Sequence, residues 1–315
     1  MKKFASFVLS LWSKRSAAIG STLLVLAVLV ACGDDDSVSV TRPRGDSSSA
    51  CEDCDGSSSS FSVTPQSSES EISVSSSSVP EGYVDPSTVV KGVMTDERDG
   101  KTYKTVTIGT QTWMAENLNY AYTEDPYTFD YFMSDSTSWC YDNDVANCAK
   151  YGRLYTWATA MDSVGRWSAN GKGCGYCDED DCGYYRKTCS PTYPVRGICP
   201  EGWHLPDTTE WKILLTAVGG RLTAGKMLKS ASGWNDYKGV NGNGTDAYAF
   251  SAMPASYRDY NGSFGDNGND TYFWSSIERE CCGADYITLH YSNDGTRQEY
   301  DYKGYGHSVR CVKDE

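Results

Sequence analysis

The segment Cys199-Pro-Glu-Gly-Trp-His-Leu-Pro-Asp-Thr-Thr-Glu-Trp-Lys-Ile-Leu-Leu-Thr-Ala-Val-Gly-Gly220 specifies its local structure more fully than any other part of the chain. Asp207 and Glu210 have the spacing of a capping box, in which each side chain accepts a hydrogen bond from the other residue's amide. Gly219-Gly220 can adopt a left-handed conformation at low cost and so ends the helix. Between these signals the apolar residues have helical spacing: Trp211, Leu214, Leu215 and Val218.

The composition is that of an acidic, exported protein. The 315-residue chain has a formal net charge of −14, which argues against nucleic acid and anionic membrane surfaces as partners. Thirteen cysteines are too many for a reduced cytosolic protein without metal, so we expect an oxidising compartment. The chain has 23 Tyr and 9 Trp but only 3 His, which favours a binding surface or a tyrosine-rich β fold over acid–base catalysis.

Residues 1–31 have the features of a targeting segment, and we expect them to lie outside the fold. Basic residues precede an apolar stretch, Ser16 to Ala31, that is shorter than the roughly 20 residues of a membrane-spanning helix. It ends in Leu-Val-Ala-Cys32, which resembles a bacterial lipobox and predicts a lipid such as palmitate on Cys32. A plain signal anchor is the alternative. The acidic run that follows, residues 33–36, resembles the sorting sequence of some surface lipoproteins, so we expect anchoring to the outer membrane with exposure at the surface.

Residues 32–86 predict a spacer between the lipid and a globular domain at residues 87–315. The segment is rich in Ser and acidic residues and lacks apolar periodicity, so it cannot bury enough surface to offset chain entropy. We expect a flexible, disordered tether. Cys51 and Cys54 within it are expected to form a local disulfide.

Within the domain, turn residues separate short apolar and aromatic runs, and no parallel βαβ alternation occurs. This indicates an α+β domain with antiparallel strands. We expect a long irregular loop at 119–133 and a Cys- and Gly-rich insertion at 165–195. The other expected elements are a hairpin of strands 90–94 and 102–108, a turn and strand at 109–118, helices at 152–161, 208–218 and 221–229, and strands at 247–253, 272–277, 286–291, 297–300 and 308–312.

Six motifs occur in order along the domain: Thr110-Gln-Thr-Trp-Met-Ala-Glu-Asn-Leu-Asn119, Tyr151-Gly-Arg-Leu-Tyr-Thr-Trp157, Cys199-Pro-Glu-Gly-Trp-His-Leu-Pro206, Phe250-Ser-Ala-Met-Pro254, Trp274-Ser-Ser276 and Val309-Arg-Cys-Val312. Together they resemble the Fibrobacter succinogenes major paralogous domain, a family of exported bacterial proteins, over residues 89–315. The insertion departs from that pattern. The family's molecular role is not established, so the resemblance implies no activity.

A more distant similarity concerns the fold. The Leu205-Pro-x-x-x-Glu-Trp211 segment, the later Trp-Ser strand and the terminal Arg-Cys strand are similar to the C-type-lectin-like fold, including its formylglycine-generating branch. This resemblance implies two main helices packed on a small twisted antiparallel sheet whose first and last strands meet. It also implies a disulfide between Cys199 and Cys311, because the segment before the helix would lie beside the last strand.

The remaining cysteines predict a disulfide framework, since their number is even once Cys32 is set aside. Cys140 and Cys148 are close enough in sequence to bridge a local loop. We expect the adjacent Cys281 and Cys282 each to reach into the insertion, with the connectivity open and a four-cysteine zinc site as the alternative. The insertion supplies Cys174, Cys177, Cys182 and Cys189.

We expect no cofactor and find no catalytic constellation. The three histidines, His204, His290 and His307, are isolated in sequence. Calcium is the metal to consider for oxygen ligands, because loops 241–246 and 266–270 carry hard oxygen ligands, but these loops lack EF-hand spacing and turn formation is the simpler explanation. The acidic residues concerned are Asp246, Asp266 and Asp270. Trp234-Asn-Asp236 matches a calcium-ligand triplet of sugar-binding C-type lectins, but at a different place in the order of elements, and we interpret the match as coincidental.

Aromatic residues are the remaining candidates for ligand binding, because flat rings suit stacking on sugar faces. Four lie in or beside the Gly- and Asn-rich loop 261–270: Tyr257, Tyr260, Phe264 and Tyr272. Trp203, Trp211 and Trp274 lie on or beside regular elements and are expected in the core. We therefore expect a non-catalytic domain that binds polysaccharide or a surface protein in adhesion or capture. The alternatives are an enzyme that modifies an exported substrate and a structural surface-coat protein.

Overall fold

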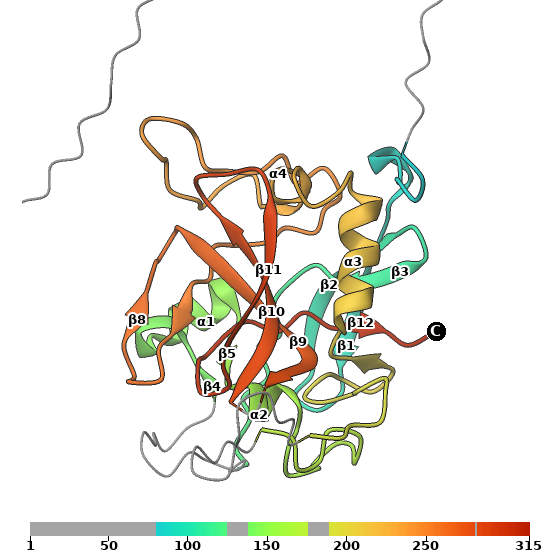
Figure 1. Ribbon diagram of the computed structural model, residues 1–315, viewed down its shortest axis with the longest axis vertical. Coiled ribbons are helices and arrows are strands. Elements are labelled where there is room, and N and C mark those ends of the chain that lie inside the picture. Colours follow the sequence, from blue (N-terminus) through green and yellow to red (C-terminus); the bar gives the residue numbers. More distant parts are fainter. Residues whose placement is uncertain (1–79, 125–137, 176–188, 281) are drawn as a thin grey trace, which may run out of the picture. The chain divides into compact units, whose positions relative to one another are not determined.

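The computed structural model describes residues 80–124, 138–175, 189–280 and 282–315, all of which belong to one compact unit, Ser73–Glu315 (Figure 1). The targeting segment, almost all of the spacer, Cys32, Cys51, Cys54, Cys177, Cys182 and Cys281 lie outside the described residues. In the ranges described, every helix is too short or too polar to cross a bilayer.

The largest sheet has the strand order β1-β2-β3-β12-β6 and is antiparallel throughout. β1 (Val90–Asp96) and β2 (Lys101–Ile108) form the expected hairpin, and β3 (Gln111–Met114) continues it. The last strand, β12 (Val312–Lys313), pairs with β3 on one side and β6 (Trp203–His204) on the other. The expectation that the first and last strands meet is therefore wrong. β2 and β3 lie between them, because the tight turn after β2 makes β3 pair with the edge of β2 that faces away from β1.

A second sheet contains the longest strands and has the order β11-β10-β9. Its members are β9 (Asp270–Glu280), β10 (Gly283–His290) and β11 (Thr296–Tyr302), which include all the residues expected as strands at 272–277 and 297–300 and all but Tyr291 of 286–291. Two smaller sheets pair β4 (Ser138–Trp139) with β5 (Leu154–Tyr155) and β7 (Tyr257–Arg258) with β8 (Phe264–Gly265).

The helices of the described residues are short. They are α1 (Val145–Tyr151), α2 (Trp157–Ala160), α3 (Thr208–Ala217) and α4 (Ala224–Leu228), with 3₁₀ turns at Pro86–Thr88 and Tyr141–Asn143. The capping box of α3 is confirmed: the Glu210 amide donates to Asp207 at 2.8 Å and the Asp207 amide donates to Glu210 at 2.9 Å. Gly219 and Gly220 both have positive φ, as a helix stop requires.

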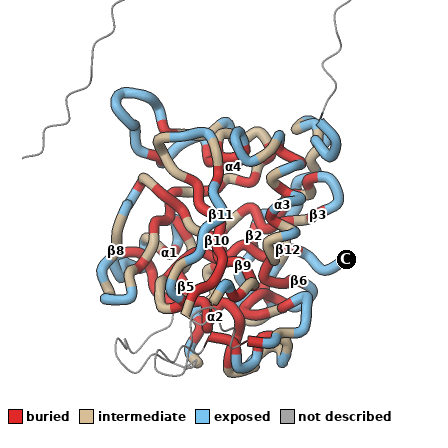
Figure 2. Tube along the Cα trace, viewed as in Figure 1, coloured by how far each residue is buried: buried red, intermediate tan, exposed pale blue. Residues whose placement is uncertain are grey.

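The core consists of two groups of buried side chains, which appear as the red interior in Figure 2. α3 packs on the main sheet through Trp211 and Trp113, whose ring centroids lie 4.6 Å apart, and Phe273 of β9 stacks on Trp211 at 5.6 Å. Trp203 and Trp274 are also buried. The prediction that these tryptophans belong to the core is confirmed. The architecture is α+β, with short helices and several small antiparallel sheets, and more strand than helix.

Three disulfides tie the described residues together. Cys199–Cys311 and Cys140–Cys148 form as expected, and the insertion closes through Cys174–Cys189. The zinc alternative is therefore wrong, because two of its four ligands are bonded to each other; Cys282 is also disulfide-bonded.

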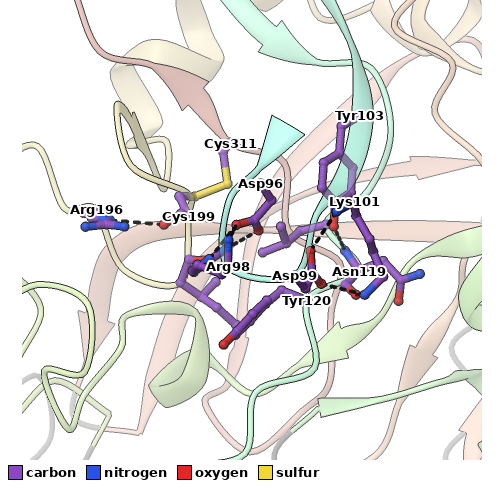
Figure 3. Close-up of polar contacts among 12 residues, drawn as sticks. Asp96, Arg98, Asp99, Lys101, Tyr103, Asn119, Tyr120, Arg196, Cys199 and Cys311 are labelled. Carbon is purple, nitrogen blue, oxygen red and sulfur yellow. Dashed lines mark hydrogen bonds and ion pairs between the residues drawn. A yellow bond between two sulfur atoms is a disulfide. The ribbon is translucent and has the colours of Figure 1, made fainter. Parts of the chain in front are cut away.

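The turn of the β1–β2 hairpin is fixed beside the Cys199–Cys311 bridge (Figure 3). Arg98 pairs with the buried carboxylate of Asp96 at 2.7 Å and donates to the Ile198 carbonyl at 2.7 Å. Its guanidinium also lies 4.1 Å from the centre of the Tyr120 ring. The hairpin and the long-range disulfide thus support one another.

Three expected elements differ from the structure. Only residues 157–160 of the segment 152–161 are helical, because Gly152 has φ of +75° and Leu154–Tyr155 pair with β4 as a strand. Residues 247–253 are not a strand, since positive φ values at Ala249 and Ser251 break the extended chain. Of residues 308–312, only Val312 lies in a strand.

Candidate functional site

The most distinctive surface in the described residues is a group of tyrosines where the β7–β8 hairpin meets the β9–β11 sheet. We call it the tyrosine cluster, and it comprises Tyr257, Tyr260, Tyr272, Tyr286, Tyr302 and Tyr305. It joins residues that are up to 48 positions apart in sequence. The fold, rather than the local sequence, assembles it.

The rings form a continuous path from solvent to the core. At the exposed end, Tyr260 lies 6.4 Å from Tyr302 and 5.6 Å from Tyr305, measured between ring centroids. Tyr305 lies 5.9 Å from Tyr257, which in turn contacts Tyr272 edge to face at 5.4 Å. Tyr260 is 39% exposed and Tyr302 is 53% exposed, so two flat rings face solvent while their neighbours hold them from behind.

The β7–β8 hairpin positions the exposed end of the cluster. Asp259 and Asn261 side chains accept hydrogen bonds from backbone amides two residues on, at 3.2 and 2.8 Å, which fixes the turn. Gly265 carries no Cβ atom, and a Cβ atom at this position would lie only 2.8 Å from the Tyr257 hydroxyl oxygen. The absence of a side chain there lets the Tyr257 ring lie across the hairpin.

His307 lies beneath the cluster and is fully buried. Its ring stacks on Tyr272 at 5.0 Å with an interplanar angle of 17°, and lies 4.2 Å from Trp274. Its Nε2 lies 3.5 Å from a carboxylate oxygen of Asp301, yet burial lowers the pKa of the imidazole. His307 is therefore neutral at pH 7 and supports the rings by packing.

Asp270 is a buried carboxylate at the start of β9 beside this cluster, with 6% of its surface exposed. Burial first, and the negative charge of Asp266 second, raise its pKa to about 7. The nearest base described is His290, whose Nε2 lies 3.6 Å away, and burial lowers the pKa of that imidazole. His290 therefore carries little positive charge near neutral pH and stabilises the ionised form of Asp270 only weakly.

Three phenols in the inner part of the cluster, Tyr257, Tyr272 and Tyr305, stay protonated at physiological pH. Burial raises the pKa of Tyr257 and Tyr272, and nearby carboxylates raise it further. Burial likewise raises the pKa of Tyr305 to about 12. These three hydroxyls can therefore donate as well as accept a hydrogen bond, which is the chemistry needed to bind sugar hydroxyls.

The structure brings three of the four sequence-predicted aromatic residues into the cluster. Phe264 differs: its ring packs on Tyr141 at 5.3 Å. The sequence reasoning missed Tyr286, Tyr302 and Tyr305. A usable signal was present in Gly304-Tyr-Gly306, where a tyrosine stands between two glycines directly after a tyrosine-rich strand.

The calcium candidates do not converge on one site. The Asp246 carboxylate accepts hydrogen bonds from the Ser251 amide and hydroxyl at 2.7 and 2.6 Å. The Asn235 amide donates to Asn267 and Asn269 oxygens at 3.0 Å each, so the Trp-Asn-Asp triplet lies against loop 266–270, but its contacts there are protein hydrogen bonds. No group of three or more His, Cys, Asp or Glu in the described ranges is placed to hold a metal ion.

His204 has a structural role. Glu210 of α3 and Asp314 at the chain end bind its two ring nitrogens at 2.6 and 2.7 Å. Burial opposes protonation, but these hydrogen bonds outweigh it and raise the pKa of His204. The imidazole thus fastens the end of the chain to the first turn of α3.

The observations define a disulfide-bonded α+β domain with an aromatic surface. The model of the Fibrobacter succinogenes major domain matches residues 106–313, which is well over half of the chain, and the chain belongs to this family. Comparison with curated proteins gave no match, and neither did comparison with solved structures.

Proposed function

We propose that this chain is a surface lipoprotein whose domain binds carbohydrate without catalysing a reaction, in adhesion or capture. The observation that carries the proposal is the tyrosine cluster, in which the exposed rings of Tyr260 and Tyr302 pack against other tyrosine rings. Such rings offer a large contact area at low entropic cost, and protonated phenols supply hydrogen bonds.

The charges around the cluster favour a neutral polysaccharide over an acidic one. The carboxylates of Asp259, Asp266 and Asp301 all raise the pKa of Tyr257 through their charge. A negative field at the surface disfavours uronate or sulfate groups and leaves neutral hexose and pentose chains as the best fit. A surface protein is the other partner class, and the experiment below separates the two.

We further infer a C-type-lectin-like arrangement of the domain. Its support is the Leu205-Pro206 segment that leads from β6 into α3, together with the disulfide that joins Cys199 to Cys311 near the chain end. An experimental structure that superposes both features on a C-type-lectin-like domain would support this inference.

Anchoring rests on Cys32 and the spacer, both features of the sequence. Cys32→Ala should move the chain from the membrane fraction to the soluble fraction and abolish labelling by palmitate. Protease treatment of intact cells should remove the domain if it is exposed at the surface. Retention of Cys32→Ala in the membrane would contradict the lipid anchor.

The test of binding uses the full-length chain in detergent, incubated with insoluble cellulose, xylan and mannan. Tyr260→Ala and Tyr302→Ala should each weaken binding several-fold, because each removes one stacking ring worth about 1 kcal/mol. Tyr237→Ala is the matched control, since Tyr237 is also exposed but packs on Tyr291 outside the cluster. The proposal is refuted if Tyr237→Ala weakens binding as much as the cluster variants, or if none of the three polymers is bound. Capture of a surface protein in place of a polymer would show that the partner is a protein.

A further inference from the structure

A second recess lies apart from the tyrosine cluster and shares no residue with it. Its volume is about 490 Å³, and its walls come from β2, the segment after β3, the C-terminal end of α1, residues 251–253 and Arg310. We propose that this recess, here called the basic groove, binds the carboxylate of an acidic sugar residue such as a hexuronate. This inference stands independently of the proposed binding of neutral polysaccharide, because it concerns other residues and a ligand of opposite charge preference.

The charge of the basic groove is opposite to that of the chain. Its cationic lining residues are Lys101, Lys104, Lys150 and Arg310, against the single carboxylate of Glu116. The whole chain carries a formal net charge of −14. A local excess of positive charge in such a chain lowers the repulsion that an approaching anion meets.

Arg310 forms part of the groove and carries a buried charge, with 1% of its surface exposed. It donates to the carbonyls of Met114, Phe250 and Ser251 and to the Asn117 side chain, at 2.6 to 3.1 Å. These bonds occupy four of the five N–H donors of a guanidinium, and no carboxylate of the described residues forms an ion pair with it.

The charge of Arg310 persists at neutral pH. Burial lowers the pKa of its guanidinium to about 9, while the charges of Asp246 and Glu116 act in the opposite direction. A buried cation without an ion-pair partner stabilises any anion that approaches it, because the low dielectric strengthens the attraction. The floor of the groove is therefore electropositive when no ligand is present.

Two lysines at the rim are able to reach an anion. Lys150 bonds the Tyr151 hydroxyl at 2.6 Å, and the described residues give it no carboxylate partner. Lys104 is 75% exposed and lies 3.5 Å from Glu116, and an exposed pair of this kind is weak enough to exchange partners. Lys101 is different, since it is held by Asp99 and by the Asn119 carbonyl at 2.6 and 2.9 Å (Figure 3).

The size and lining of the groove indicate a sugar acid rather than a lone oxyanion. Small-molecule sites typically have volumes of about 300–1,000 Å³, well above the space that one phosphate ion fills. Tyr103 and Met253 add apolar surface beside the cations, and Asn119 also lines the groove. A pyranose ring that carries a carboxylate matches this combination of charge, apolar contact and amide groups.

The test measures binding of trigalacturonate to the full-length chain in detergent by titration calorimetry, with galactotriose and inorganic phosphate as comparison probes. Trigalacturonate should bind with an affinity that falls as salt rises, whereas galactotriose should not bind this site. The double variant Lys104→Gln/Lys150→Gln should weaken trigalacturonate binding about tenfold or more. Lys91→Gln, which removes one exposed lysine charge of β1 outside the groove, is the control and should have no effect.

The possible outcomes separate the two proposals. Tyr260→Ala should leave trigalacturonate binding unchanged. If this variant loses only its binding to neutral polymers, the result bears on the tyrosine cluster and not on the basic groove. The basic-groove proposal is wrong if trigalacturonate does not bind, if galactotriose binds the site as tightly, or if Lys91→Gln weakens binding as much as the double variant. Competition by millimolar phosphate at equal affinity would also overturn it, because the site would then recognise any anion.

Discussion

The buried carboxylate of Asp270 should make the domain less stable as pH rises, and Asp270→Asn should remove this dependence. Burial and the charge of Asp266 raise the pKa of Asp270 from an ordinary 3.8 to about 7. The folded protein therefore binds this proton more tightly than the unfolded chain does. The stability that comes from the protonated carboxyl is complete below about pH 3.8 and is lost as pH rises through about 7.

The size of the effect follows from the two pKa values. The interval from 3.8 to about 7 corresponds to at most about 4 kcal/mol of unfolding free energy. Between pH 5 and pH 8 the expected part of this loss is roughly 2 to 3 kcal/mol. Asn has nearly the same shape without the charge, so Asp270→Asn should be more stable than the unmodified chain at pH 8 and closer to it at pH 5.

Urea unfolding of the full-length chain, followed by tryptophan fluorescence at pH 5 and pH 8, measures this difference. Asp266→Asn is the control, because it removes only the neighbouring exposed charge and should recover a small part of the effect. The reasoning is refuted if the free-energy gap between Asp270→Asn and the unmodified chain is the same at both pH values, or larger at pH 5. An equal gap would mean that Asp270 ionises as an ordinary carboxyl, and a larger gap at pH 5 would mean that its pKa is not raised by folding.

Two further predictions concern stability. Replacing Cys199 and Cys311 by Ala should cost about 5 kcal/mol, because the bridge closes a loop with a sequence separation of 112, whereas replacing Cys140 and Cys148, separated by 8, should cost about 2 to 3 kcal/mol. Urea unfolding under non-reducing conditions compares the pairs, and equal costs would contradict the loop-entropy argument. Asp207→Ala should cost about 1 kcal/mol by removing the cap of α3, with Asp207→Asn as the tolerated variant, and thermal unfolding should rank the two in that order.

Elements defined by nearby residues could be predicted from the sequence. The capping box of α3 depends on two side chains three positions apart, and the β1–β2 hairpin depends on the turn at Arg98-Asp-Gly100. Both interactions are complete within a few residues, so local chemistry decides them. The distant resemblance to the C-type-lectin-like fold then supplied the pairing of Cys199 with Cys311, which no local pattern contains.

Elements decided by distant contacts were predicted poorly. Leu154, Trp157 and Met161 have helical spacing, yet pairing of Leu154–Tyr155 with β4 divides that segment. Residues 247–253 alternate as a strand would, but the Asp246 carboxylate bonds Ser251 and folds the segment back. In both cases a tertiary interaction outweighs the intrinsic preference of the segment.

Part of the tyrosine cluster could be predicted, because three of its members are near one another in sequence. Tyr257, Tyr260 and Tyr272 lie close together in sequence around a glycine-rich loop, which marked them as a group. Tyr302 and Tyr305 join them only because the backbone of Arg258 pairs with Gly306, far along the chain. The positive charge of the basic groove could not be predicted from the sequence, because its lysines come from β2 and α1, which lie far apart along the chain.

The position of β12 between β3 and β6 has a consequence for how the protein comes into being. The main sheet is joined only when residues 312–313 take their place, and the buried Arg310 and Cys311 arrive just before them. A chain whose synthesis has not yet reached these residues therefore lacks the strand that links the two parts of this sheet. The main sheet therefore stays in two parts until residues 312–313 have been synthesised, and a stop codon before them would leave β3 and β6 without the strand that joins them.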